Sequence, residues 1–510
     1  MTKILSSLSI KILASVAIFL SFVLIISNNL DPDLGWHIKS GEWILSHLEI
    51  QHFDEFSFSM FGHRWVNHEW FVDIFLFLTQ TNHLWWLTIL LFSSLASIPP
   101  IYYIFRSQNK LDLMLIFGAA FSLTPYLGIR PQIISWFIFF ILARFLQNLF
   151  NQKNFIFIDS LKIIILFWLW SNLHASFPAG FLLYFIFILT SYFHQKRKFP
   201  IFRHAITFFA CIGITLINPY GLELFTEIIQ VAISGSTSQY IVEWQSVFVF
   251  FSLENWTIIA TAILLLIGFR KKINIFNLFS AIIFLLAYAK SVRIGPFFFI
   301  TLYPIIITTA PYIIKKIKKS ISQSPTLKSQ LAYTIIILLL ISLTNIAGKI
   351  AFIKPPKTPD QAINFLQNNF EPQQITLFNA YSWGGYLINH YPENKVFIDG
   401  RMPHWTDQTG QSAMQDYTKI NTQTNNWKEI FPKYGINTVF IKNINRDKTK
   451  NFLTKNIFYL LNRYPTLNIF AQKYVQPPLV DLESELIKND WQKIYEDNLI
   501  VILRQNTPKQ

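Results

Sequence analysis

The chain has 510 residues, of which 52% are hydrophobic and only 14% are charged, and its formal net charge is +15. Soluble domains carry about 25% charged residues, so this composition leaves too little polar surface for a soluble globular enzyme. The lysines and arginines form short clusters between apolar runs rather than a basic stripe interleaved with aromatic residues, which excludes a nucleic-acid partner. The sequence therefore predicts a mainly α-helical, polytopic membrane protein.

A membrane span needs about 20 apolar residues, and the chain contains about eleven candidate runs. The first run follows Lys3 and no small-x-small cleavage site comes after it, so we predict an uncleaved span. Cys211 is the one cysteine, which excludes an intramolecular disulfide. The runs lie near residues 10–29, 84–105, 111–128, 131–149, 156–172, 177–193, 203–218, 250–269, 274–289, 294–313 and 331–348.

Basic residues alternate strongly between successive loops, which predicts the orientation. If the N-terminus is cytoplasmic, the inner loops contain Arg106 and Lys110, Lys153, Lys196 to Arg203, Arg270 to Lys272, and Lys315 to Lys328. The opposite loops contain few cations. The positive-inside rule then places the first long loop, about 29–83, and everything after about residue 350 outside the cytoplasm, in a multi-pass protein of the plasma membrane.

The C-terminal part becomes polar after a proline-rich linker at 354–359. Strand-like runs at 375–378, 395–398, 438–441 and 499–503 alternate there with helical stretches, which is typical of a small α/β domain. We therefore predict a transmembrane domain at 1–349, which includes the loop, and an extracytoplasmic α/β domain at 350–510.

The first outer loop contains the richest mixture of ionisable groups. Asp33 and His37 have the i,i+4 spacing that would put both on one helix face, with Asp31 near the helix start. A carboxylate and an imidazole so placed can hold a divalent metal or transfer a proton. His68 and Glu69 begin a second predicted amphipathic helix and join the catalytic candidates. The alternative is a pair of interfacial helices whose carboxylates cap helix starts.

Three cations, Arg130, Lys290 and Arg293, are predicted where the outer leaflet meets water. Arginine offers a planar fork suited to phosphate oxygens, so these residues are candidates for binding a donor phosphate. The alternative is contact with lipid headgroups. In the C-terminal domain, Asn379 and Asp399 follow two predicted strands, where α/β sheets bind ligands. With Tyr381 and Arg401 they are candidate acceptor or ligand residues, although Asp399 and Arg401 can equally form a structural ion pair.

The segment Asp33-Leu34-Gly35-Trp36-His37, followed by Asp54 and Gly62, resembles the first outer loop of oligosaccharyltransferase catalytic subunits in the GT-C superfamily. The plan of many spans and an outer soluble domain is also similar to protein mannosyltransferases and lipid A aminoarabinose transferases. The resemblance implies that Asp33 activates the acceptor or holds a divalent metal such as Mg²⁺ or Mn²⁺, and that Arg130 or Arg293 meets the donor phosphate.

Physical considerations favour a lipid-linked donor. Soluble nucleotide sugars are absent outside the cytoplasm, and the chain contains no nucleotide-binding fingerprint. We therefore expect a membrane glycosyltransferase that moves a sugar from a polyprenyl-phosphate donor to a glycan, lipid or protein acceptor. The competing interpretations are a transporter or flippase of lipid-linked glycans and a non-catalytic assembly protein. A transporter would carry charges near the bilayer midplane and repeated halves, and neither is evident.

Overall fold

The computed structural model describes residues 7–29, 31–151, 155–196, 199–233, 241–248, 253–322, 356–443 and 480–506. Contacts divide the chain into two compact units that alternate along the sequence. The first unit comprises Met1–Leu30, His83–Leu224 and Glu243–Pro355, and the second comprises Asp31–Asn82, Phe225–Val242 and Pro356–Gln510. The sequence-based division counts the first outer loop with the membrane domain, whereas the contacts group it with the C-terminal segment.

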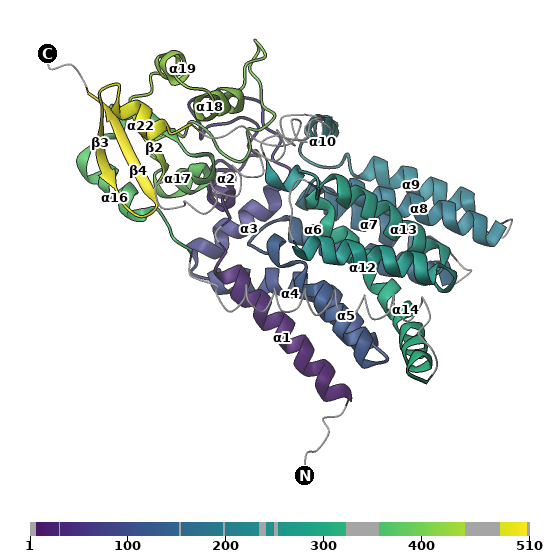
Figure 1. Ribbon diagram of the computed structural model, residues 1–510. Coiled ribbons are helices and arrows are strands. Elements are labelled where there is room, and N and C mark those ends of the chain that lie inside the picture. Colours follow the sequence, from purple (N-terminus) through teal and green to yellow (C-terminus); the bar gives the residue numbers. More distant parts are fainter. Residues whose placement is uncertain are drawn as a thin grey trace, which may run out of the picture. The chain divides into compact units, whose positions relative to one another are not determined.

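The first unit is a bundle of apolar helices (Figure 1). Helix α4 packs on α1 and α6, and α14 packs on α5 and α13. Asparagine side chains start two of the helices, because Asn109 accepts the N–H of Asp112 in α5 and Asn274 that of Asn277 in α13. The helices are α1 (Ser7–Ser27), α4 (Trp85–Arg106), α5 (Lys110–Phe121), α6 (Gln132–Asn151), α7 (Phe157–Leu173), α8 (Pro178–Gln195), α9 (Ile201–Ile214), α12 (Leu253–Phe269), α13 (Ile275–Lys290) and α14 (Gly295–Ser322).

Every predicted span within the described residues is helical, and four helices are long and apolar enough to cross a membrane. These four are Leu8–Ser27, Trp85–Arg106, Gln132–Asn151 and Val292–Lys316. They confirm the multi-pass membrane character. The other runs form helices of 12 to 18 residues, and a 12-residue helix is only about 18 Å long. The number of spans and the orientation stay predictions, and the run at 331–348 and Lys328 lie outside the described residues.

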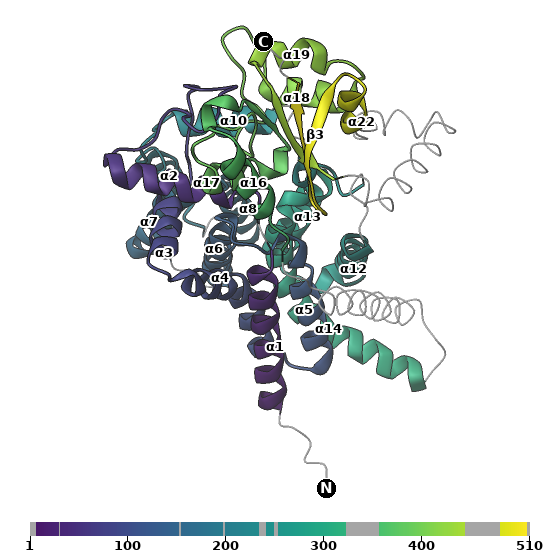
Figure 2. The ribbon, with the colours of Figure 1, turned by 90° about the vertical axis from the view of Figure 1, so that its left-hand side faces the viewer.

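The second unit combines short helices with one four-stranded sheet (Figure 2). The strand order is β1-β2-β4-β3, with β1 parallel to β2 and the other pairs antiparallel. Phe378 anchors the core, with its ring 5.1 Å from Phe397 and 5.3 Å from Phe431. The elements are α2 (Leu34–His47), α3 (Trp70–Thr81), most of α10 (Glu223–Ile233), α16 (Asp360–Asn369), β1 (Leu377–Asn379), α17 (Gly384–His390), α18 (Ala413–Thr422), α19 (Trp427–Tyr434), β2 (Thr438–Lys442), α22 (Leu482–Ile487), β3 (Trp491–Glu496) and β4 (Ile500–Gln505).

The predicted strand at 395–398 is wrong. Val396 makes a single bridge to Ser57 of the first outer loop and is not part of the sheet. The other three predicted strands overlap β1, β2 and β4, while β3 was not predicted. The C-terminal segment therefore contains a small mixed sheet, as an α/β fold requires, but with one antiparallel edge strand in place of the expected fourth run.

Candidate functional site

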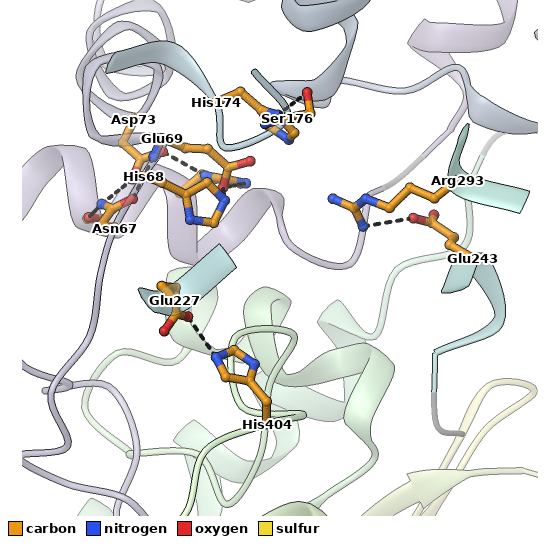
Figure 3. A network of polar contacts seen from close by, with 12 residues as sticks. Asn67, His68, Glu69, Asp73, His174, Ser176, Glu227, Glu243, Arg293 and His404 are labelled. Atoms are coloured by element: carbon orange, nitrogen blue, oxygen red, sulfur yellow. Dashed lines mark hydrogen bonds and ion pairs between the residues drawn. The ribbon is translucent and has the colours of Figure 1, made fainter. Parts of the chain in front are cut away.

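The first outer loop forms the two helices that its sequence predicts, and α2 carries His37 into a buried polar cluster. Nδ1 of His37 lies 2.6 Å from Oδ1 of Asp73 on α3. The amide of Asn67 donates to the other oxygen of Asp73 at 2.8 Å and to Ser40 at 2.8 Å. Figure 3 shows Asn67, Asp73, His68 and Glu69 gathered around the start of α3. Because Asp73 holds Nδ1 of His37 and is itself held by Asn67, the imidazole is held in one orientation.

The charge of His37 follows from these partners. Burial alone would lower the pKa of His37, because it disfavours the imidazolium. The charge and hydrogen bond of Asp73 outweigh burial, and Glu69 adds to them, so the pKa of His37 is raised above its ordinary value. At neutral pH, His37 is therefore an imidazolium that donates to the carboxylate of Asp73.

Glu69 lies between two imidazoles. Its Oε2 is 3.9 Å from Nε2 of His37 and 3.7 Å from Nε2 of His68. One oxygen and two nitrogens are a donor set that could hold a transition-metal cation better than Mg²⁺, and Asp73 behind His37 is the outer-shell carboxylate usual for a metal-bound histidine. Because His37 is protonated at neutral pH, it would have to lose its proton before it could bind a cation, whereas Glu69 and His68 offer donors of the right type without that step.

Asp33 lies against the C-terminal segment. It precedes α2, its backbone N–H donates to Oδ1 of Asp31 at 2.8 Å, and its carboxylate lies directly against the Cα of Gly400. A Cβ at residue 400 would overlap that carboxylate. Asp31 therefore shapes the helix start, while the carboxylate of Asp33 lies against Gly400 and its charge still contributes to raising the pKa of His37.

Beside Asp33, the turn at 399–401 forms a buried ion cluster. Arg401 donates to both oxygens of Asp399, at 2.8 and 2.6 Å, and contacts Asp54 of the first outer loop at 2.8 Å. All three side chains are at most 1% exposed. The guanidinium also lies 4.7 Å from the ring centre of Trp65 and 5.3 Å from that of Trp405. Asp399 and Arg401 thus form the ion pair that the sequence allowed as the alternative to ligand binding.

The remaining two C-terminal candidates, Asn379 and Tyr381, make contacts that support the fold. Asn379 is fully buried, and its amide bonds the backbone of Ala380, Phe397 and Ile398 through both donors and both acceptor positions. No capacity is left for a ligand, so its role is to join β1 to the segment at 397–398. Tyr381 is half-buried beside Tyr417, whose hydroxyl accepts its backbone N–H at 3.2 Å.

In the first unit, two of the predicted phosphate-binding cations meet on one carboxylate. Arg130 and Arg293 both pair with Glu243, Arg293 at 3.3 Å. Figure 3 shows the pair of Arg293 and Glu243. Burial would raise the pKa of Glu243, but the two guanidinium groups lower it below its usual range, so Glu243 is ionised. The trio has a net charge of +1. Lys290, at the end of α13, is exposed and does not join the trio.

Several of these partners were not predicted as site residues, namely Asp73, Asn67, Glu243 and a further pair in the second unit, Glu227 and His404. Oε1 of Glu227 lies 2.7 Å from Nε2 of His404 (Figure 3). A sequence signal was the close spacing of Asn67, Glu69 and Asp73 around the start of α3. The partners of His37, Glu243 and Glu227 are distant in the sequence.

Comparisons with known proteins show the fold. No family model matches the chain, and no curated protein matches it in sequence. The structure is similar to the archaeal oligosaccharyltransferase AglB from Archaeoglobus fulgidus in complex with an inhibitory peptide and a dolichol-phosphate, with a TM-score of 0.55 and 9% identity over 85% of this chain and 69% of that one.

Two further structures of the Archaeoglobus fulgidus oligosaccharyltransferase agree. The apo form has a TM-score of 0.52 and 11% identity over 86% of this chain and 70% of that one. The form tethered to an acceptor peptide containing the NVT sequon has a TM-score of 0.51 and 12% identity over 86% and 69%. The chain thus has an oligosaccharyltransferase-like fold.

Proposed function

We propose that this protein is a membrane glycosyltransferase that moves a sugar from a polyprenyl-phosphate-linked donor to an acceptor outside the cytoplasm. The observation that carries the proposal is the fold shared with an oligosaccharyltransferase that was solved with a dolichol-phosphate. The ionisable groups of the first outer loop and the Arg130–Glu243–Arg293 trio support it, because a transfer from a lipid phosphate needs a base and a cationic site.

Each group of residues has its own role in the proposed reaction. Arg130 and Arg293 bind the donor phosphate and stabilise the negative charge that develops on it as the glycosidic bond breaks. Asp33 accepts the proton of the acceptor nucleophile. A divalent cation, when bound, would supply additional positive charge, and Glu69 with His68 would hold it.

The turn at 399–401 positions the base. Because the Asp33 carboxylate rests on Gly400 and the same turn binds Asp54 through Arg401, the C-terminal segment fixes the outer loop that contains the base. The acceptor is a glycan, lipid or protein whose hydroxyl or amide can reach Asp33. The protein lies in the plasma membrane with its N-terminus in the cytoplasm and its C-terminal segment outside.

The test is a transfer assay with purified full-length protein, polyprenyl-phosphate hexoses as donors, and release of the polyprenyl phosphate as the readout. Asp33→Asn keeps the shape of the side chain and removes its charge, so it should lower the rate by about 10²- to 10⁴-fold. The matched control is Asp31→Asn, two residues away, which keeps the oxygen that accepts the N–H of residue 33.

Two outcomes would decide against the assignment. If Asp33→Asn and Asp31→Asn transfer equally well, Asp33 is not the base, and Glu69 becomes the next carboxylate to replace. If the wild-type protein releases no phosphate from any donor while Arg130→Gln and Arg293→Gln bind the donors as well as it does, the glycosyltransferase proposal fails.

A further inference from the structure

A second cationic site lies at the opposite ends of the spans, where α4 and α6 finish, far along both helices from their outer-loop connections. Arg106 is on the last turn of α4, and Arg144 is seven residues before the end of α6. The guanidinium carbons of both lie 4.9 Å from the ring centre of the same side chain, Tyr102. The loop charges predict that these helix ends face the cytoplasm.

The two arginines lack an acidic partner. Within the described residues, neither forms an ion pair with a carboxylate, and Asp112 and Asp159, the carboxylates nearest in sequence to these helix ends, accept backbone N–H groups at the starts of α5 and α7. Lys11 also lies at the end of α4, where its ammonium donates to the carbonyls of Phe105 and Ser107, but the charge of Asp112 offsets it in part. The two guanidinium groups at the ring of Tyr102 repel each other, so an anion would relieve the repulsion.

Arg144 is built into the protein rather than extended along its surface. It donates to Gln147, which donates in turn to Asn277 at 2.9 Å, and Tyr103 contacts the same glutamine. Its Nε is buried without a partner, while the far edge of the guanidinium reaches the exposed Asn148 at 3.3 Å. The network fixes the fork and leaves one edge accessible. An arginine that merely extended toward water would not need such partners.

The apolar surface beside this site matches an amphiphile. Ile98 is one turn before Tyr102 and two before Arg106 on α4, and Ile141 is one turn before Arg144 on α6. Both isoleucines are exposed, at 38% and 39%. The two helices pack together here, since Tyr102 lies 5.4 Å from Phe140. Cations at the membrane boundary with bare apolar side chains one turn deeper are the arrangement that a headgroup phosphate and its acyl chains require.

We infer that Arg106 and Arg144 form a binding site for the phosphate of an anionic phospholipid, in the leaflet that the loop charges predict to be cytoplasmic. The site is separate from the proposed donor site and does not depend on the transfer reaction. It binds one headgroup through the accessible edge of Arg144 and through Arg106, with the acyl chains against Ile98 and Ile141.

The experiment is native mass spectrometry of the full-length protein in detergent, titrated with phosphatidylglycerol or phosphatidylcholine. The wild type should bind one phosphatidylglycerol more tightly than phosphatidylcholine. Arg144→Gln and the exposed Arg106→Gln should each weaken phosphatidylglycerol binding by about tenfold or more, because each removes a charge-assisted contact. The matched control is Arg270→Gln, an exposed arginine at another predicted cytoplasmic turn, which should leave binding unchanged.

Arg106→Gln keeps the test valid if Arg144→Gln disturbs folding, because Arg106 is exposed and has no part in the glutamine network. Equal weakening by all three variants would reveal diffuse attraction to basic loops and would overturn the proposal. Binding of phosphatidylcholine as tightly as phosphatidylglycerol would also overturn it. Displacement of the lipid by an equal concentration of inorganic phosphate would assign the site to a soluble anion instead.

Discussion

Removing the charge of Arg401 should strongly destabilise the second unit, because its side chain and both of its acidic partners are at most 1% exposed. Arg401→Met keeps an unbranched apolar stem against Trp65 and Trp405 but leaves the carboxylates of Asp54 and Asp399 buried without a cation. Breaking a fully buried pair in this way costs about 3–5 kcal/mol. That cost corresponds to an increase of roughly two to four powers of ten in the equilibrium constant for unfolding of the unit.

The assay is pulse proteolysis with trypsin, which cleaves after the exposed Arg64 in the first outer loop once the loop is released. The control is Arg504→Met in the same unit. Arg504 is half-exposed, stacks on Phe370 at 4.2 Å and contacts the carbonyl of Gln374 at 3.4 Å, so its loss should cost less than about 1 kcal/mol. If the two variants are cleaved at the same rate, the buried cluster does not hold the loop, and the reasoning about the turn at 399–401 is wrong.

Two further predictions concern the same unit. Gly400→Ala should displace the Asp33 carboxylate and lower the transfer rate, whereas Gly213→Ala, whose added Cβ meets open space, should not. The raised pKa of His37 stabilises the fold fully below the ordinary imidazole value of about 6.5, and this contribution is lost as the pH rises through the raised value. The melting temperature of the wild type should therefore fall on the alkaline side, and the exposed-site control His47→Gln should behave in the same way. In Asp73→Asn the fall should be smaller. Identical pH profiles for all three proteins would contradict the assigned charge of His37.

Local patterns predicted local structure well. The Asp-Pro-Asp start of α2 and the short spacing of Asp399 and Arg401 could be interpreted from the sequence because the interacting groups are within a few residues of each other. The partners of His37 and Arg401 could not, because Asp73 and Asp54 reach them only through the packing of the whole unit.

The errors in the sheet have a similar cause. Strand β3 is an edge strand with mostly exposed or half-exposed side chains, so its sequence lacks the apolar alternation that identifies a strand. The run at 395–398 has that apolar character for another reason. Its backbone bonds to Asn379 and makes one bridge to Ser57, and its side chains fill the core. Burial in the core therefore explains its apolar residues although the run does not pair in the sheet.

The contact between the first outer loop and the turn at 399–401 also sets an order of events during synthesis. The hydroxyl of Ser59 donates to the carbonyl of Phe397, 338 residues further along the chain. At about 5–20 residues per second, the ribosome needs roughly 20–70 s to make that interval. The loop therefore leaves the ribosome long before its partners exist, and it must wait, with Asp54 still hydrated, until the last segment of the chain has been delivered to the same side of the membrane.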